Sequence, residues 1–576
     1  MKEVTRRARR RRILSAMGAA ALCMPAVGQT LGAASPESLG SGVKWTFDGE
    51  LSQGLTWRTS RRNLELVGPS HGGLQATDLQ DDGNLNSDRG TLVSSPTIAL
   101  GTLEAQYKNH RVLLRASYVY DGAVMDHWNT WGLDWYPGIL RSEVRDSVGS
   151  RAQLLDAYYA GDFDLQDAGA LEFKLGRQTI MWGEAKFLPG GINMFNPIQS
   201  WKSHAAGVSL KELVLPVASA GATWQLNPTV SFQGFYQLEK LRFEYDPVGT
   251  FFSDNDILGA GAGTVGVVPG APPLFRGPDP KSKTGGQYGL ASFLNLEGVN
   301  LGFYFQNLQQ RAAKVSGLGL NGQTSYFWEF PDDVKTLGTS FSTGLGSAAF
   351  TGELAYRHDV PIGLDPNAVG AARTNAALCG AILGAPSNCG VDFGAAPFNI
   401  PVPPLASTPL RAQANGYVQG WTRVDQWALN LGLTQAMTGS DFLPRLLGAN
   451  GGLVAIEANA IHSGMPNQFV LPTAVKGAWT GSVIAQAAVD YFRVGGSSIT
   501  VTPRLVLQTW VFGDDPTQAP FFKGRLNATA AVQLRHEQKP DWTLEFAYTN
   551  ISDHTSRGNL VLSDRDYFSM LAKWAF

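Results

Sequence analysis

The sequence is poor in charge and in cysteine, and it has no long apolar run after its N-terminal region. Only 16% of its 576 residues are charged, below the roughly 25% that is usual for soluble domains. Nowhere in that later region do about 18 uncharged apolar residues follow one another, which excludes a helical membrane protein. Disorder is excluded because hydrophobic residues make up 44% of the chain and aromatic residues 10%. A β-rich chain with thinly spread apolar residues remains.

The N-terminus has the pattern of a secretory signal peptide. A strongly basic start is followed by an apolar stretch, residues 13–27, that is too short to span a bilayer. Ala26 and Gly28 fit a cleavage site, and a second site fits after Ala34. The arginine run also permits a twin-arginine signal, whereas Leu22 before Cys23 disfavours a lipoprotein. We expect a signal peptide at 1–28, a short periplasmic segment at 29–43 and a membrane domain at 44–576.

The charge and the cysteine content of the chain limit the kinds of partner and the cellular compartment that we expect. Without residues 1–28, the chain has 39 Lys and Arg against 47 Asp and Glu, a net charge of −8, so no basic surface for nucleic acid is expected. Cys379 and Cys389 then remain, close together in a segment rich in Gly, Pro and Ala. In an exported protein such a pair is expected to form a disulfide, with free thiols or metal ligands as the alternatives.

The dominant hydrophobic period is two, which is typical of strands with one apolar face. In the last nine residues, one face carries Phe568, Met570, Ala572, Trp574 and Phe576. Eighteen predicted strands begin near residues 44, 91, 110, 154, 171, 217, 229, 287, 299, 323, 348, 421, 450, 478, 498, 521, 542 and 566. Connections after odd-numbered strands are mostly long, and those after even-numbered strands are short.

This asymmetry favours a transmembrane barrel over a soluble β protein whose apolar faces pack together, the alternative interpretation. In hydrocarbon an unpaired peptide group is costly, so strands cross a membrane only as a closed ring. Short turns on one side and long loops on the other, with an even strand number, place both termini in the periplasm. Aromatic residues also gather near strand ends, as at membrane interfaces, for example Trp45, Trp57, Trp427 and Trp542.

We therefore predict an all-β protein: a single closed antiparallel barrel of about 18 strands, with 16 as the alternative, in the bacterial outer membrane. Its strands are joined by long extracellular loops. Phe576 at the end of an alternating strand resembles the C-terminal recognition signal that the barrel-assembly machinery reads, and an aromatic residue at the membrane interface is the alternative. Outer-membrane lipids are the expected surroundings.

The alternation stops between Gly176 and Pro216. Pro189 and the two glycines after it force a turn, Asn196 and Pro197 force another, and residues 209–215 read as a short helix. Irregular backbone at membrane depth is tolerated only where protein buries it or water surrounds it. We therefore predict that residues 179–215 fold inward into the barrel as a constriction.

Here the chain resembles a known family. The run LGRQxxxWGExxFxPGGINxxNP, which spans residues 175–197, is followed by KELVLP at 211–216, FYQLE at 235–239 and DPVGTFFS at 246–253. These motifs resemble an uncharacterised family of proteobacterial outer-membrane proteins catalogued as a domain of unknown function. The resemblance implies a single barrel. It also implies two partners often encoded beside the family, an outer-membrane lipoprotein-like protein and a resistance-nodulation-division type transporter, and hence apolar or lipid-like substrates.

Several side chains of this segment are candidates for lining the pore or binding a solute. Ionisable groups inside a barrel usually pair, so Arg177, Glu184 and Lys186 form either a charged eyelet or an ion pair that holds the segment. The other candidates offer an apolar surface or amide groups: Gln178, Trp182, Phe187, Asn193, Phe195 and Asn196. Other inward charges are mixed, with Arg111, Arg115, Arg504, Arg525 and Arg535 against Glu239 and Glu545.

Three functions fit this sequence. The first is a channel for small apolar or amphipathic compounds, and the second is an outer-membrane partner of a transporter machine that moves lipids or hydrophobic substrates. The third, a membrane-embedded lipid hydrolase, has only His462–Ser463 and Ser552–His554 as candidates, and neighbouring strand residues point to opposite faces. We therefore expect no enzyme. No cofactor motif is present, and Asp254 and Asp256 are more typical of solvated loop acids than of a Ca²⁺ site, so no metal is expected.

Overall fold

A computed structural model gives the fold of the chain. It describes residues 42–75, 77–126, 141–188, 190–206, 208, 210–266, 273–281, 285–320, 323–364, 369–370, 372–374, 376–377, 412–413, 415–464, 478–513, 523–536, 541–553 and 562–576. The predicted signal peptide and the Cys379–Cys389 pair lie outside these residues. No described helix is long and apolar enough to cross a membrane.

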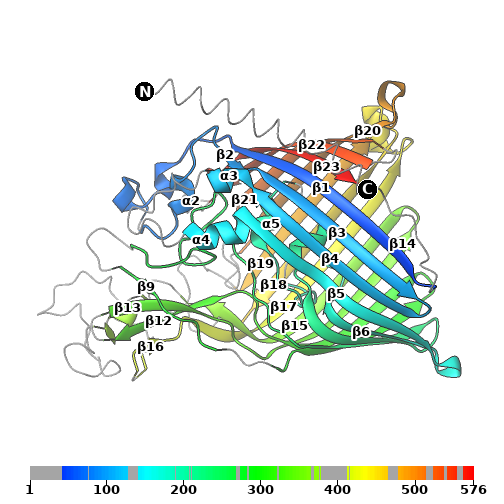
Figure 1. Cartoon of the computed structure of the whole chain (residues 1–576), viewed down its shortest axis with the longest axis horizontal. Coiled ribbons are helices and arrows are strands. Elements are labelled where there is room, and N and C mark those ends of the chain that lie inside the picture. The colour runs from blue at the N-terminus through cyan, green and yellow to red at the C-terminus, as the bar shows by residue number, and fades with distance from the viewer. Residues whose placement is uncertain are drawn as a thin grey trace, which may run out of the picture.

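Eighteen strands form one closed antiparallel barrel, which confirms the predicted fold class (Figure 1). They are β1 (Lys44–Arg58), β3 (Pro96–Tyr107), β4 (His110–Asp121), β5 (Ser150–Asp164), β6 (Ala170–Gln178), β7 (Val217–Gln225), β8 (Val230–Gln237), β10 (Tyr288–Leu296), β11 (Val299–Leu308), β14 (Val334–Leu345), β15 (Ala348–Gly363), β17 (Trp421–Thr438), β18 (Gly451–Ser463), β19 (Trp479–Asp490), β20 (Ile499–Phe512), β21 (Arg525–His536), β22 (Asp541–Asp553) and β23 (Tyr567–Ala575). Each pairs with the next along the chain, and β23 pairs with β1.

Closure of the ring depends on the register between its two terminal strands. Trp57 of β1 lies opposite Phe568 of β23, and Glu50 lies opposite Ala575. Gly49 and Phe576 then exchange both backbone hydrogen bonds, each at 2.9 Å. Because every strand has two neighbours, the wall has no open edge, as hydrocarbon requires.

Side chains alternate between the two faces of the wall, as the period of two predicts. On β4, Val112, Leu114 and Tyr118 are exposed on the outer face. On the inner face of the same strand, Arg115 forms an ion pair with Asp156 of β5 at 2.7 Å. An apolar outside and a paired, polar inside are typical of a barrel set in lipid.

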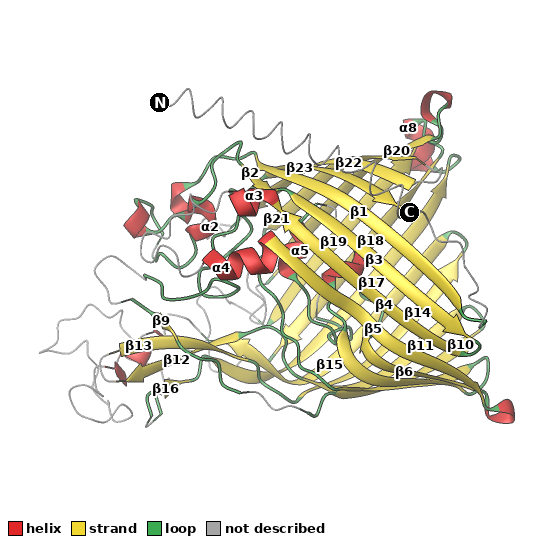
Figure 2. Cartoon of the chain, in the orientation of Figure 1, coloured by secondary structure: helices red, strands yellow, loops and turns green. Residues whose placement is uncertain are grey.

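The two ends of the barrel differ. Turns at one end are short, such as residues 108–109 between β3 and β4 and residues 297–298 between β10 and β11. The longer connections lie at the other end, where they carry α2 (Asp82–Leu85), α3 (Gly122–Asp126) and α4 (Arg141–Val144) (Figure 2). Further α-helices in the described residues are α5 (Ser200–His204), α6 (Leu210–Leu213) and α8 (Phe442–Leu447), and α8 lies in the turn between β17 and β18. The predicted asymmetry of the connections is confirmed.

A second, four-stranded sheet projects from the long-loop end and corrects one predicted strand (Figure 1). It consists of β9 (Phe275–Arg276), β12 (Lys314–Leu320), β13 (Gln323–Glu329) and β16 (Tyr417–Val418). The strand predicted near Gln323 is β13, which pairs with β12 rather than with the wall. The wall strand is β14, because Val334 continues the ladder with β11. A further short strand, β2 (Leu92–Ser94), pairs with β1.

Candidate functional site

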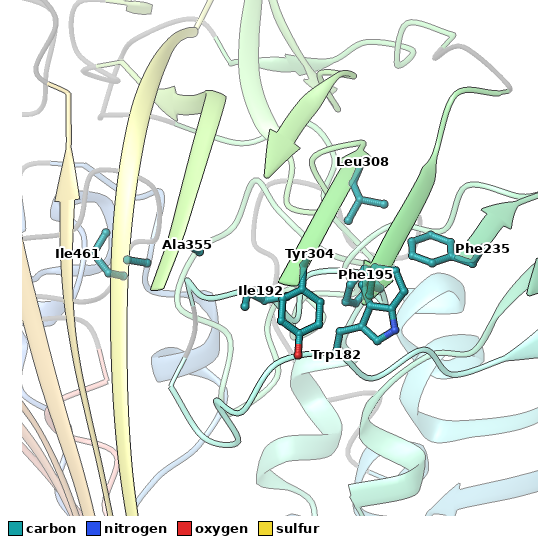
Figure 3. Close-up of a cluster of buried hydrophobic side chains, with 10 residues drawn as sticks. Trp182, Ile192, Phe195, Phe235, Tyr304, Leu308, Ala355 and Ile461 are labelled. Atoms are coloured by element: carbon teal, nitrogen blue, oxygen red, sulfur yellow. The ribbon is translucent and has the colours of Figure 1, made fainter. Parts of the chain in front are cut away.

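The segment between β6 and β7, residues 179–216, lies against the inner face of the barrel. Trp182, Ile192 and Phe195 form a buried cluster with inward side chains from an arc of the wall that runs from β8 to β18 (Figure 3). These wall residues are Phe235, Ala291, Tyr304, Leu308, Ala355, Ala428 and Ile461. Four of these ten residues are aromatic, and the rings of Trp182 and Phe195 meet edge to face with centroids 4.9 Å apart. Apolar packing therefore fixes this part of the segment on the wall.

A buried carboxylate on β15 holds the middle of the segment. Glu353, 3% exposed, accepts hydrogen bonds from the backbone N–H groups of Glu184 at 2.7 Å, Ala185 at 3.2 Å and Ile192 at 3.1 Å. Asn430 of β17 donates to the same carboxylate at 3.2 Å. An irregular segment has N–H groups that no sheet or helix satisfies, and an ionised carboxylate is a strong acceptor for them.

A second carboxylate, on β18, holds the next three residues in the same way. Glu457 is 5% exposed and accepts from the backbone N–H groups of Lys186 at 2.9 Å, Phe187 at 3.2 Å and Leu188 at 2.7 Å. The two anchors come from strands that are separated only by β17. Together they hold the backbone of residues 184–188 and of Ile192 on the wall.

Glycines allow this close approach. Gly183 has a φ of +82°, a conformation that other residues adopt at a cost, and a Cβ there would lie 2.4 Å from Glu353 Oε2. A glycine of the wall also leaves room for the segment. A Cβ on Gly338 of β14 would lie 2.7 Å from Cγ1 of Ile192. Segment and wall therefore fit only because these positions lack side chains.

Amide and guanidinium groups hold the carbonyl groups of the segment. Arg311, after β11, donates to the backbone carbonyl of Phe195 at 2.8 Å, and Gln306 donates to that of Ile192 at 2.9 Å. Asn196 donates to the carbonyl of Ile180 at 2.6 Å. Donors and acceptors of the irregular backbone thus both find partners, as buried polar groups require.

The second half of the segment is fixed by an ion pair. Arg151 of β5 binds Glu244 through two hydrogen bonds of 2.7 and 3.0 Å, and Gln199 donates to the same carboxylate at 2.7 Å. The N–H of Glu244 donates to the carbonyl of Ile198 at 3.0 Å. Lys202 of α5 is buried nearby, and burial lowers the pKa of its ammonium group to about 8 although Glu212 opposes this shift.

Among the residues of the segment whose side chains the structure describes, five are exposed, and a solute can meet these. They are Met181 at 62%, Phe187 at 47% and Ile198 at 38%, together with Lys186 and Ser203. Glu184 is half-buried, and burial raises the pKa of its carboxyl group although Lys186 opposes this shift. The exposed surface of the segment is thus apolar, with one cation and one acid beside it.

The predicted site residues separate into three groups. Lys186 and Phe187 are exposed, Glu184 and Asn193 are partly exposed, and Asn193 donates to the sulfur of Met181 at 3.8 Å. Trp182, Phe195 and Asn196 are buried and hold the segment together. Gln178 is also buried and donates to the carbonyl of Ser219 at 3.1 Å.

One candidate points the wrong way. Arg177 precedes Gln178 on β6, so the two side chains lie on opposite faces, and Arg177 shares the outer face with exposed Leu175. Its Nε donates to Glu239 Oε1 at 3.0 Å. The prediction that Arg177 lines the constriction is therefore wrong, because strand alternation turns it away from the lumen. Glu239 is its partner rather than an inward charge.

Sequence reasoning missed Glu353, Glu457 and Arg311, which do most of the anchoring. The signal that could have found the first two is their position: each is a carboxylate in the middle of an otherwise largely apolar strand. An acid there faces inward and needs donors.

The histidine and serine considered for hydrolysis do not form a catalytic pair at residues 462–463. The ring of His462 packs on Trp479 with centroids 4.8 Å apart. Ser463, 1% exposed, instead accepts a hydrogen bond from Gln426 at 3.0 Å on the inner face. His554 of the second pair lies outside the described residues.

Comparison with known proteins gives one family and several distant structures. A family model described as "Protein of unknown function (DUF1302)" matches residues 11–576. No curated protein matches the sequence. Similar solved structures include OccAB3 of Acinetobacter baumannii, with 8% identity and a TM-score of 0.41 over 92% of this chain and 99% of that one. OccAB1 of the same organism has 8% identity and a TM-score of 0.42 over 95% and 98% of the two chains. The A. baumannii outer membrane channel DcaP has 10% identity and a TM-score of 0.35 over 94% and 100%.

Proposed function

The chain belongs to the DUF1302 family, and from this premise we propose that it is an outer-membrane channel for small apolar or amphipathic compounds. Two features of the wall support a membrane location. Its outer face is apolar, and its ring of strands is closed. A ring of 18 strands is wide enough to leave an aqueous lumen unless something fills it.

The observation that carries the proposal is the anchored segment. Glu353 and Glu457 hold its backbone against the inner wall, so that Met181, Lys186 and Phe187 project from it. A fixed constriction selects solutes by its size and by the groups that line it. An apolar surface with one adjacent ammonium group favours compounds that have an apolar body and at most one polar or anionic group.

Single-channel recording tests the constriction. We compare the wild type with the double variant Glu353→Gln/Glu457→Gln, in which each anchor loses its charge and turns an amide N–H₂ toward the segment. Glu297→Gln is the matched control, since Glu297 is exposed in a short turn. The double variant is expected to conduct more and to fluctuate more, whereas the control behaves like the wild type. An unchanged conductance in the double variant, with folding intact, contradicts the constriction.

Uptake into proteoliposomes tests the substrate class. Wild-type protein is expected to admit small aromatic or aliphatic acids faster than sugars of similar size. The variant Met181→Ala/Phe187→Ala is expected to narrow that difference, because it removes the exposed apolar groups of the segment. A wild-type protein that is electrically silent and changes the uptake of no solute contradicts a channel function altogether.

A second candidate function, docking to a periplasmic transporter machine, is favoured by one observation at the short-turn end. Phe442 and Leu446 of α8 are 72% and 67% exposed, which is unusual for large apolar side chains in water. The proposed partners are an outer-membrane lipoprotein-like protein and a resistance-nodulation-division type transporter. Crosslinking in cells is expected to capture one of them, and Phe442→Ser/Leu446→Ser is expected to abolish capture. Leu64→Ser, at the opposite end, is the control. Capture by the α8 variant at wild-type level contradicts this candidate.

A further inference from the structure

Two long loops meet at the end of the barrel that carries α2. The loop between β1 and β3 contributes Asp81 and Asp82, and the loop between β8 and β10 contributes Asp256. The N–H of Asp81 donates to Asp256 Oδ2 at 3.1 Å, and the N–H of Asp256 donates to the carbonyl of Leu79 at 2.9 Å. The two loops are therefore in direct contact where these acids lie.

The three carboxylates converge although two of them are buried. One oxygen atom of each lies within 4.8 Å of those of the other two. Asp81 is only 1% exposed and Asp256 only 2% exposed. Like charges this close and this far from water repel one another strongly unless a cation lies between them or one carboxyl group takes up a proton.

Each of the two buried acids has one oxygen atom without a partner. Oδ2 of Asp81 accepts from the N–H of Gly68 at 2.8 Å and lies 2.9 Å from Nδ1 of His71. Oδ1 of Asp81 and Oδ1 of Asp256, in contrast, are buried and have no hydrogen-bond partner among the described residues. A buried carboxylate oxygen without a partner is rare and marks a missing ligand or water.

The nearest groups that can be positive are His71, 2.9 Å from Asp81 Oδ2, and Arg565, which interacts electrostatically with Asp256 without an ion-pair contact. In the described part of the chain, neither Asp81 nor Asp256 forms an ion pair with a lysine or arginine. Arg58 pairs with Asp564 at 3.0 Å, and Arg565 donates to the carbonyl groups of Phe251 and Ser253. Asp78 lies nearby in sequence, but each of its carboxylate oxygen atoms accepts a hydrogen bond from Ser70.

We propose that Asp81, Asp82 and Asp256 bind a divalent cation, Ca²⁺ by its chemistry, that fastens the two loops together. Ca²⁺ binds oxygen atoms at about 2.3–2.6 Å, so two of its ligands lie at most about 5 Å apart, as these do. It accepts irregular geometry, whereas Mg²⁺ demands a near-ideal octahedron and keeps most of its water. His71 and Gly68 hold the second oxygen of Asp81 and so orient the first.

Calorimetric titration of the whole protein with CaCl₂ tests this site. The protein is refolded into detergent from inclusion bodies, so that no lipopolysaccharide brings cations with it, and is treated with EDTA and desalted. The wild type is expected to bind one Ca²⁺ per chain and to melt at a higher temperature with Ca²⁺ present. Asp256→Asn and Asp82→Asn are each expected to weaken binding about tenfold or more. Asp88→Asn is the control, because Asp88 lies in the same loop but is exposed and paired with Arg62.

Three outcomes overturn the proposal. The first is no saturable binding by the wild type at about 10 mM Ca²⁺, well above the dissociation constants usual for extracellular Ca²⁺ sites. The second is wild-type affinity in both Asp256→Asn and Asp82→Asn. The third is a loss of Ca²⁺ affinity in Asp88→Asn as large as that in Asp256→Asn and Asp82→Asn. Heat-modifiable gel mobility shows which variants fold, and should Asp256→Asn fail to fold, the wild type and Asp82→Asn still decide.

Discussion

Glu353 occupies the space that a side chain at position 191 would need. A Cβ on Gly191 would lie 1.6 Å from Glu353 Oε1. We therefore predict that Gly191→Ala displaces the segment from its anchor and lowers the free energy of unfolding by about 1–3 kcal/mol. Urea unfolding in detergent micelles measures the loss. Gly344→Ala is the control, since nothing lies within 4 Å of a Cβ there. Equal stability of the two variants would show that the segment is not held as tightly as the structure implies.

Glu184 is expected to make ion selectivity depend on pH. Burial raises the pKa of its carboxyl group above the ordinary 4.5. As pH falls from 7, this group therefore takes up its proton earlier than an exposed glutamate, and the lumen loses a negative charge. The permeability ratio of cations to anions should fall over this range in the wild type and not in Glu184→Gln. Reversal potentials in a salt gradient measure the ratio, and parallel curves for the two proteins would refute the prediction.

Lys202 should make stability rise with pH above about 8. Its folded-state pKa is lowered to about 8 from an ordinary 10.5, because burial disfavours the charged form although Glu212 opposes this shift and Arg151 adds to it. Between these two values the unfolded chain binds a proton that the folded chain has released, so stability increases with pH. In Lys202→Met this increase should be absent. The measurement is the difference between the two unfolding free energies from pH 7 to 10.5, and a constant difference contradicts the prediction.

Phe576 is expected to matter for assembly more than for final stability. The centroids of the Phe576 and Trp574 rings lie 4.9 Å apart. The Phe576 ring also covers Gly49, and a Cβ on Gly49 would lie 2.3 Å from Cε2 of that ring. Phe576→Ala should cost about 1–2 kcal/mol through the lost ring contacts and should slow membrane insertion markedly. Phe512→Ala, an exposed aromatic on β20, is the control. Pulse-chase labelling with heat-modifiable gel mobility measures insertion, and equal rates for the two variants would exclude a recognition role for Phe576.

The wall was predictable from the sequence because a period of two is a local signal. The strand near Gln323 shows where that signal ends. The hairpin of β12 and β13 alternates like the wall, but Gln323 pairs with Leu320 in the projecting sheet. Alternation in the sequence predicts that a strand exists. The sheet to which the strand belongs depends on the strands with which it pairs, and the sequence pattern does not show these. The wall strand begins only at Val334, eleven residues after Gln323.

The site was predictable in part. Loss of alternation and the run of Pro, Gly and Asn located the inward segment, but not its anchors. Glu353 is 169 residues from Glu184, and Glu457 is 271 residues from Lys186. No local pattern relates residues so far apart. Arg177 is different, because its place next to Gln178 on a strand already meant that only one of the two side chains could face inward.

These long separations in sequence also bear on the order in which the molecule is built. Residues 179–216 leave the ribosome well before β15, which begins at Ala348, and before β18, which begins at Gly451. Phe235 of β8 and Tyr304 of β11, which contact Trp182, are made before those strands, but until β15 and β18 arrive the N–H groups of the segment lack their carboxylate partners. An incomplete barrel therefore already has the aromatic contacts of this segment, but the carboxylates that fix its backbone are added only with β15 and β18.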